Sequence, residues 1–516
     1  MLPSRYRGKI LFFTYVAVAA TYVAFFWGFK YVPTQDGPVH LSTAVVLKSL
    51  LAGDSLYTDY YELNLTPAPY WAYHGVTVPL LAAFRPLVAE KIFLSLYVIA
   101  FAAAAWYFTK AAAGKASALG LLFLVAATSY PFQMGFFNFM VGLPAFLLTT
   151  AFFWSRRERA DWRFWAVLNL LVAACYFTHL IAVGAAIISI WVMSLWLAAT
   201  APGGRRFLRG PLYLAPSYIL PAYYLIATPK GGEYDFSSLG RLARELFSSR
   251  VFVSFGPAQE AVAWAVTALV LLLLAAAIAG RLRGSGRRLR PSDSFAALAG
   301  IFVVIYFAAP GATPQGVFYI SERMALFPFL LITPWLAVNV PRLLVRPAAG
   351  VAVALAVANL VPLGRYYVRG NAELKVFNSG CCVVARGGTL LPLIKDPTAR
   401  GRSVETLRHA VAYYVVSNGG CNLVDIGAGA PHFPVKYASG VTSPPYLGKS
   451  SGLRVYDVEA DRPAADYVFA YDMNPFLAEV GPLFERYRPV HFKDKLIIFE
   501  RVAGRAGEGA TARAGE

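Results

Sequence analysis

An acidic residue and a histidine stand four positions apart in the stretch Gln35–His40, directly after the first long apolar segment of the chain. If this stretch forms a helical turn, the side chains of Asp36 and His40 can face a common cleft. A carboxylate at a boundary between water and membrane can take a proton from an incoming hydroxyl, and a histidine can donate to a phosphate oxygen or orient the acid. A simpler interpretation is that Asp36 starts the helix that Pro38 begins, as a cap. The residues alone leave both interpretations open.

Two basic residues stand at the entrances of later apolar segments. Lys91 follows Glu90, and Arg323 follows Glu322. Snorkelling to the membrane interface beside an ion-pair partner explains either cation, and for Lys91 alone we favour it. An enzyme that handles a lipid-linked phosphate needs a cation at this depth, and Arg323 is the better candidate for that role.

Other polar residues predicted near the same surface are weaker candidates for a role in the site. Asp59, Glu62 and His74 belong to the long loop after the first apolar segment, where most acids are simply solvated. Asn138 and His179 mark tight turns between paired apolar segments, where they could line a cavity or cap helices. We therefore carry forward Asp59, Glu62 and Glu322 as candidate secondary acids, and His74, Asn138 and His179 as candidate cavity-lining residues.

The composition is that of a polytopic membrane protein. Of 516 residues 58% are hydrophobic and only 15% charged, and the mean hydropathy is +0.52. A soluble domain cannot bury that much apolar surface. The net charge of +19 does not indicate nucleic-acid binding, because the basic residues up to Leu363 gather in particular connecting loops. Arg5, Arg7 and Lys9 precede an apolar run too long for a signal peptide, so we expect a retained first span.

Apolar runs predict about eleven transmembrane helices. They are Ile10–Phe29, Ala89–Phe108, Ala118–Pro131, Phe139–Trp154, Phe164–Phe177, Leu180–Ala199, Pro211–Ala227, Ala261–Ala279, Phe295–Ala309, Ala325–Val338 and Ala348–Leu363. The loop over residues 30–88 also contains two amphipathic stretches, Val39–Leu51 and Tyr73–Leu87. We expect both to lie in the membrane interface, and in the second Pro79 argues against a clean span.

The charge distribution predicts the orientation. Loops on the N-terminal side hold 19 lysines and arginines against three acids, Glu158, Asp161 and Asp293. Loops on the other side, up to Leu363, hold nine lysines and arginines against ten acids. The positive-inside rule therefore places the N-terminus in the cytoplasm of a plasma or inner membrane, with the Asp36 loop and the C-terminal region outside.

The character of the chain changes at residue 364. Residues 1–363 form the predicted membrane module, residues 364–502 a small extracytoplasmic α/β domain, and residues 503–516 a disordered tail rich in Gly, Ala, Arg and Glu. In the α/β domain we expect strands at Cys382–Val384, Leu423–Ile426 and Leu496–Phe499, and a helix over Ser403–Val416. The Gly-rich run Gly427–His432 resembles part of a phosphate loop, but Pro431 favours a turn.

The four cysteines give one structural expectation. Cys175 lies in an apolar run, where it reads as a small buried hydrophobe. The other three fall in the predicted outer domain, so one disulfide from Cys421 to Cys381 or Cys382 would leave one thiol over. No CxxC spacing suggests a zinc site.

With these pieces in place, the chain resembles the GT-C superfamily of membrane glycosyltransferases, which includes protein O-mannosyltransferases and aminoarabinose transferases of lipid A. The resemblance covers the layout of nearly the whole chain. It is carried by Gln35–His40, by Ala89-Glu90-Lys91, by Gly135–Gly142 and by Ser321-Glu322-Arg323.

This resemblance implies an enzyme that moves a sugar from a polyprenyl-phosphate donor to an acceptor hydroxyl on the outer face, with inversion. Asp36 would be the general base, with His40 beside it, and Arg323 and Lys91 would hold the donor phosphate. Many members carry a second acid in the loop between spans 3 and 4. Here that loop, Pro131–Phe139, has no carboxylate, so the sequence leaves open whether a divalent cation takes part.

Two other classes of protein compete with the transferase. A transporter of lipid-linked glycans often shows internal repeats and charges inside its spans, whereas several spans here carry no formal charge in their cores. A non-catalytic assembly protein would leave the grouping of Asp36, His40 and Arg323 unexplained. The partners expected of a transferase are the lipid-linked donor, an acceptor glycan, lipid or protein, and membrane lipids, with no nucleic acid.

Overall fold

The computed structural model describes most of the chain. The described residues are 4–159, 161–228, 233–283, 289–313, 318–394, 404–441, 443–444, 446–450, 453–456, 465–472 and 486–502. The expected tail over residues 503–516 lies outside them. The chain divides into two compact units. Unit 1 is Met1–Gly37, Thr66–Val368 and Arg402–Val404, and unit 2 is Pro38–Leu65, Arg369–Gly401 and Glu405–Glu516.

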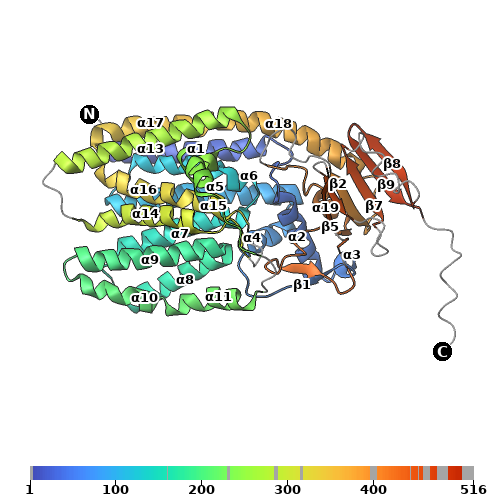
Figure 1. Ribbon diagram of the computed structural model, residues 1–516, viewed down its shortest axis with the longest axis horizontal. Coiled ribbons are helices and arrows are strands. Elements are labelled where there is room, and N and C mark those ends of the chain that lie inside the picture. The colour runs from blue at the N-terminus through green and yellow to red at the C-terminus, as the bar shows by residue number, and fades with distance from the viewer. Residues whose placement is uncertain are drawn as a thin grey trace. The chain divides into compact units, whose positions relative to one another are not determined.

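Unit 1 is a bundle of apolar helices (Figure 1). Among the described residues, eight helices are long and apolar enough to cross a membrane. In chain order the helices of this part are α1 (Ser4–Trp27), α4 (Ala72–Ala83), α5 (Pro86–Ala113), α6 (Tyr130–Gln133), α7 (Phe137–Arg156), α8 (Trp162–Thr178), α9 (Leu180–Thr200), α10 (Gly210–Tyr213), α11 (Ala215–Ala227), α12 (Leu239–Phe247), α13 (Pro257–Arg283), α14 (Ser294–Ala308), α15 (Ile320–Met324), α16 (Leu326–Asn339), α17 (Arg342–Ala358) and α18 (Leu360–Phe377), of which α18 continues into unit 2.

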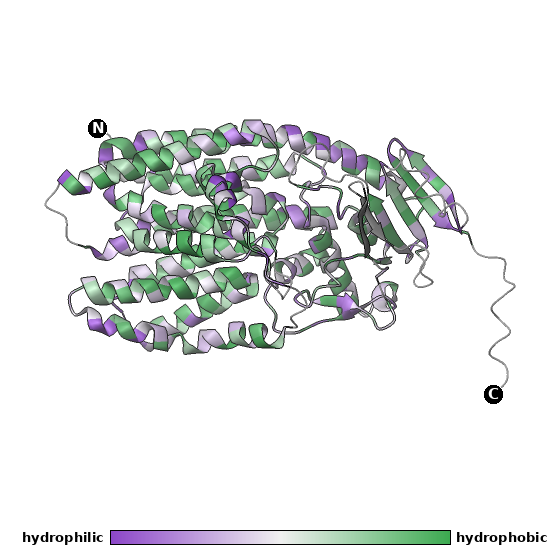
Figure 2. Ribbon diagram, in the orientation of Figure 1, coloured by the Kyte–Doolittle hydropathy of each residue, from purple (hydrophilic) through white to green (hydrophobic). Residues whose placement is uncertain are grey.

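The predicted spans correspond to these helices, with two differences in length and type. Residues Ala118–Thr128 form a 3-10 helix, η1, which is buried at all but its first residue. The span expected over Pro211–Ala227 is divided at Leu214 into α10 and α11, because Pro216 has no N–H to continue the backbone hydrogen bonds of α10. Hydrophobic residues dominate the long helices in Figure 2. The fold class predicted from the sequence, a polytopic helical membrane protein with a small C-terminal α/β region, is confirmed.

Unit 2 is built on a five-stranded sheet in the order β3-β2-β7-β9-β8. Its strands are β2 (Thr389–Ile394), β3 (Cys421–Asn422), β7 (Tyr467–Tyr471), β8 (Tyr487–Lys493) and β9 (Leu496–Arg501). Strands β3, β2 and β7 are parallel, and β9 runs antiparallel to both β7 and β8. The helix α19 (Ala412–Asn418) connects β2 to β3, and its Tyr414 packs edge-on against Phe469 of β7 at 4.6 Å.

The first half of the long loop also belongs to unit 2. It forms α2 (Gly37–Leu51), α3 (Ser55–Thr58) and β1 (Tyr61–Leu63), and β1 pairs antiparallel with β4 (Val435–Tyr437). Tyr57 and Tyr60 donate to the carbonyls of Val415 and Gly387. The expected interfacial helix Val39–Leu51 is therefore largely buried, because its apolar face packs inside the protein.

Three local expectations for this region are wrong. Residues 382–384 and 423–426, expected as strands, are turns, and the expected helix over Ser403–Val416 begins only at Ala412. Only the strand at Leu496–Phe499 is present, as part of β9. The expected disulfide from Cys421 is also wrong: none of the four cysteines forms a disulfide, and Cys421 is buried in β3 with its thiol against Tyr61. Residues 427–432 form turns, as Pro431 suggests.

Candidate active site

The backbone of Asp36 is fixed on the turn between α6 and α7. Gln35 N donates to the Gln133 carbonyl at 3.1 Å, and Asp36 N donates to the Met134 carbonyl at 3.0 Å. The Gln35 side-chain amide donates to Asp36 Oδ1 at 3.1 Å, which holds the carboxylate. Asp36 is partly exposed, while Gln35 is buried. The carboxylate is therefore both positioned by its neighbours and accessible.

Gly135 makes this close approach of two backbones possible. Its φ is +82°, a conformation that favours glycine. A Cβ on this residue would lie 2.6 Å from Gly37 N and 2.8 Å from Asp36 N. The glycine that opens the Gly135–Gly142 run is thus required by the placement of Asp36.

Arg323 is buried at the start of the span formed by α15 and α16. Its guanidinium lies 4.1 Å from the ring centroid of Phe136, and Nη1 donates to the Phe318 carbonyl at 3.0 Å. The Nε atom is buried without a hydrogen-bond partner among the described residues. A guanidinium held by an aromatic face and one carbonyl keeps further N–H groups for a ligand.

Asp36 and Arg323 come within electrostatic range of each other, although 287 positions separate them. Tyr70, Tyr319 and Glu322 interact electrostatically with the same guanidinium. Unit 1 therefore brings a partly exposed carboxylate and a buried cation, two of the candidates selected from the sequence, into the same region. We refer to Asp36, Arg323, Tyr70, Tyr319 and Tyr130 as the Asp36 cluster, because Tyr130 also interacts with Asp36 and Tyr319.

Two tyrosines of this cluster have a left-handed backbone that sequence reasoning missed. The φ angles are +79° at Tyr70 and +56° at Tyr319. Non-glycine residues adopt this region at a cost of about 1–2 kcal/mol, and such strain gathers at functional sites. Burial raises the pKa of Tyr70, and the nearby Arg323 charge partly offsets that rise. Neither position has a glycine or asparagine, so the sequence gives no signal of this conformation.

Asn138 and His179 support the same region as caps. Asn138 Oδ1 accepts from Tyr73 N at 2.8 Å, in the first turn of α4, so it caps a helix other than its own. His179 Nδ1 accepts from Ile181 N at 3.0 Å and caps α9, while its ring packs edge-on against Tyr70 at 4.7 Å. These contacts position Tyr70 and α4.

His74 is a buried histidine one turn after Tyr70. Its Nδ1 lies 3.3 Å from the Tyr70 carbonyl. Burial lowers the pKa of His74 to about 4, so the imidazole is neutral at pH 7. A neutral ring in this position supports the strained Tyr70 backbone and supplies no cation.

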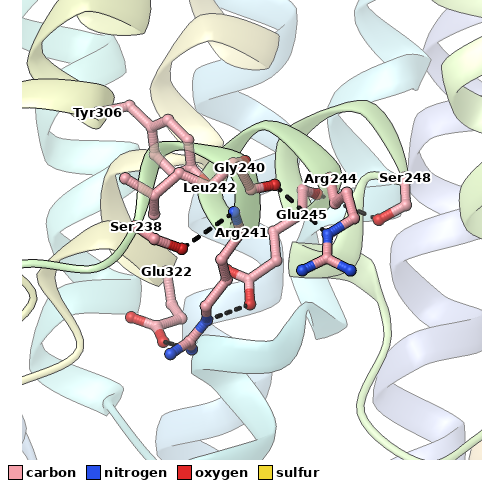
Figure 3. Close-up of polar contacts among 9 residues, drawn as sticks. All are labelled: Ser238, Gly240, Arg241, Leu242, Arg244, Glu245, Ser248, Tyr306 and Glu322. Atoms are coloured by element: carbon pink, nitrogen blue, oxygen red, sulfur yellow. Dashed lines mark hydrogen bonds and ion pairs between the residues drawn. The ribbon is translucent and has the colours of Figure 1, made fainter.

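Glu322 is occupied by an ion pair with α12. Its carboxylate lies 3.9 Å from Arg241, which also pairs with Glu245 at 2.8 Å, as Figure 3 shows. Ser238 caps this helix, and Tyr306 donates to the Leu242 carbonyl. Glu322 thus ties α12 to the segment that carries Arg323.

Lys91 is placed at the end of α1. Its ammonium donates to the Phe29 carbonyl and lies 5.7 Å from the ring centroid of Trp27. Beside it, Glu90 is buried, and Oε1 has no hydrogen-bond partner among the described residues. These contacts favour the snorkelling interpretation, and the structure does not bring Lys91 into the Asp36 cluster.

The three remaining candidates belong to unit 2. The His40 ring, in α2, stacks on Phe433 at 5.4 Å. Asp59 is exposed at the end of α3, and Glu62 of β1 pairs with Lys436 of β4 at 3.2 Å. Glu62 is thus a cross-strand ion-pair partner. Across the described residues no group of three or more His, Cys, Asp or Glu side chains is arranged to hold a metal ion.

Comparison with known proteins gives matches only among solved structures. The crystal structure of ArnT from Cupriavidus metallidurans bound to undecaprenyl phosphate matches with a TM-score of 0.55 at 13% identity, covering 96% of this chain and 98% of that one. The same protein in the apo state matches with a TM-score of 0.54 at 14% identity, covering 98% and 100%. No protein-family profile and no curated protein matches by sequence.

The likeness extends over the full length of both chains. At this identity it shows the fold and not the reaction. The fold of this chain is that of ArnT, which agrees with the fold that the resemblance stated from the sequence implies.

Proposed function

We propose that this protein is a membrane glycosyltransferase that moves a sugar from a polyprenyl-phosphate donor to an acceptor hydroxyl. The fold it shares with ArnT, one of whose structures contains undecaprenyl phosphate, supports the reaction class. The observation that carries the proposal is that Asp36 and Arg323 both lie against the turn between α6 and α7. Asp36 N donates to the Met134 carbonyl at 3.0 Å, and the Arg323 guanidinium lies 4.1 Å from the ring centroid of Phe136.

In the proposed reaction Asp36 is the general base. It takes the proton of the acceptor hydroxyl while that oxygen bonds to the anomeric carbon from one side. The bond between this carbon and the donor phosphate oxygen breaks on the other side, so the product has inverted configuration. The backbone hydrogen bonds of Gln35 and Asp36 hold the carboxylate in one place, which lowers the entropic cost of reaching this geometry.

Arg323 stabilises the leaving polyprenyl phosphate. The phosphate gains charge as the bond breaks, so it needs neutralisation more than protonation. The guanidinium stacks on Phe136, and its Nε makes no hydrogen bond to the described residues. It can therefore offer two parallel N–H groups to phosphate oxygens. Tyr70 and Tyr319 flank it and can position the same group through their hydroxyls.

The proposed role of His40, which is to support Asp36, rests only on the four-residue spacing between the two. Lys91 is a weaker candidate than Arg323 for binding the donor phosphate. The lysine is already engaged by Phe29 and Trp27. Of the three candidate secondary acids, Glu62 and Glu322 are held in ion pairs, and Asp59 is exposed at the end of α3.

The decisive experiment measures release of polyprenyl phosphate by purified protein supplied with polyprenyl-phosphate sugars. The Asp36→Asn variant should lose at least roughly 10²-fold in turnover, because a positioned base contributes about 10²–10⁴-fold. Asp235→Asn is a matched control, since Asp235 is an exposed acid of the loop between α11 and α12 with no proposed role in the reaction, and it should turn over like the wild type. Full activity of the Asp36 variant would remove this residue from the mechanism, whereas loss in both variants would point to a general effect of outer charge.

A further inference from the structure

A cavity of about 630 Å³ lies in unit 1 at the helix ends remote from the Asp36 cluster. It is formed by the C-terminal ends of α5, α7 and α16 and by the start of α14. On the α15–α16 span its residue Val338 lies fifteen positions after Arg323, and on α7 its residue Trp154 lies sixteen positions after Asn138. At 1.5 Å per residue both separations are about 22–24 Å. The cavity is thus a separate site at the opposite ends of these helices.

The walls of this cavity carry two cations and several hydroxyls. Lys110 of α5 and Arg157, which follows α7, supply the positive charge, and Tyr107, Ser155 and Ser292 supply O–H groups. Tyr107 and Ser155 are already hydrogen-bonded to each other at 2.9 Å. Ser292 precedes the first turn of α14, and the N-cap acid of that helix, Asp293, is paired with Arg281. This set of groups suits an anion with several oxygens.

Arg157 is held ready for such a ligand. Its guanidinium lies 4.2 Å from the ring centroid of Trp154, and Nη1 donates to the Trp154 carbonyl. The Nε atom is buried, has no hydrogen-bond partner among the described residues, and lies 3.8 Å from Glu158 Oε1. The other oxygen of Glu158 binds Arg206, so this acid is shared between two arginines and does not neutralise Lys110.

We propose that this cavity binds the phosphate headgroup of an anionic phospholipid from the leaflet that the charge distribution assigns to the cytoplasm. A lipid is favoured over a soluble phosphate because the cavity opens at the ends of membrane-spanning helices. Ala111, Ala112 and Val338 add apolar surface beside the cations, as a headgroup with its glycerol and acyl chains requires. The proposal does not depend on the transferase activity.

The test compares lipid retention by native mass spectrometry. Purified protein is delipidated and offered phosphatidylglycerol or the zwitterionic phosphatidylcholine. Wild type should retain phosphatidylglycerol, and the double variant Lys110→Gln/Arg157→Gln should retain it roughly tenfold less, because charge-assisted hydrogen bonds are lost. The control Arg156→Gln removes the same charge one residue away, where the guanidinium lies over Phe152 outside the cavity, and should behave like the wild type.

Each outcome decides the proposal. Equal retention by the double variant and the wild type, or equal loss in the Arg156 control, would overturn it. Displacement of the lipid by millimolar inorganic phosphate, with equal thermal stabilisation, would show that the ligand is a soluble phosphate and would overturn the lipid assignment. If the double variant does not fold, Lys110→Gln decides alone, because Lys110 is exposed and its loss leaves the packing intact.

Discussion

The proposed stabilisation of the leaving phosphate depends on the side chain of Arg323. A lysine in its place would keep the charge but lose the planar fork and the stacking on Phe136. We expect Arg323→Lys to raise KM for the lipid-linked donor about tenfold or more and to lower kcat as well, because the same contact stabilises the departing phosphate. Steady-state kinetics over a range of donor concentrations measures both effects.

The matched control is Arg244→Lys, since Arg244 is an exposed arginine of α12 whose Nε donates to the Gly240 carbonyl of its own helix, as Figure 3 shows. That variant should keep both constants. If the Arg323→Lys variant keeps the wild-type KM and kcat, Arg323 does not bind the donor phosphate. Lys91 would then be the next cation to substitute.

The buried carboxyl of Asp425 should make the free energy of unfolding of unit 2 depend on pH. Burial raises the pKa of this carboxyl from 3.8 to about 6, even though it accepts a hydrogen bond from Gly427 N at 2.8 Å. The folded state therefore binds the proton more tightly than the unfolded state. The free energy of unfolding should fall as pH rises from about 4 to about 6, by roughly 3 kcal/mol, and then level off.

The Asp425→Asn variant should remove most of this dependence, because the amide cannot ionise and its oxygen still accepts from Gly427 N. The buried thiol of Cys421 can report unfolding of unit 2. The protein, with Cys381 and Cys382 replaced by serine, is equilibrated in urea at each pH. The exposed fraction of the Cys421 thiol is then measured by a short pulse of a thiol-reactive label at one fixed pH. A wild-type midpoint that is constant from pH 4 to pH 7 would contradict the prediction.

At the scale of elements, the turn between α6 and α7 determines where Asp36 lies. Gly135→Ala should displace the Asp36 backbone, because the added Cβ meets two backbone nitrogens below 3.0 Å and φ is positive. We expect roughly a 10²-fold loss of kcat, since small misplacements of reacting groups cost this much. Gly184→Ala in α9 adds the same methyl group where no atom lies within 4 Å, and it should be neutral. Activity is measured with folded protein, checked by size-exclusion chromatography.

The same scale shows what the sequence can and cannot predict. Long apolar helices such as α5 and α13 are recognisable because a membrane helix satisfies all its backbone hydrogen bonds by itself. Short apolar runs such as 382–384 carry no such local constraint, and they became turns. The sheet of unit 2 depends on pairing between β2 and β7, which lie 77 residues apart at Leu390 and Tyr467, so no local pattern announces it.

The candidate site also has features that the sequence could predict and features that it could not. Asp36 and Arg323 could be selected because charged residues beside apolar spans are few. Their convergence depends on tertiary contacts of α6, α7 and α15. The left-handed Tyr70 and Tyr319 were missed because their strain is imposed by packing and not by residue type. Lys91 looked equivalent to Arg323 by position, and only its contacts with α1 separate the two.

For the whole molecule, the orientation in the membrane is the prediction with the widest consequence. A polyprenyl-phosphate donor must meet the Asp36 cluster on the outer face, whereas the cavity near Arg157 must face the cytoplasm. Both assignments follow from the same excess of lysine and arginine in the loops of the N-terminal side. One measurement of orientation therefore tests both.

Cys382 provides a native reporter because it is exposed in unit 2, whereas Cys175 and Cys421 are buried. A membrane-impermeant maleimide should label it in cells whose inner membrane is intact, and Cys382→Ser should remove most of that labelling. In the Cys382→Ser background, Arg283→Cys places a thiol at the exposed end of α13, on the predicted cytoplasmic side. That thiol should react only after the membrane is opened. The reverse pattern would place the Asp36 cluster inside, where a lipid-linked donor on the outer leaflet cannot reach it, and the proposed reaction would then fail together with the orientation.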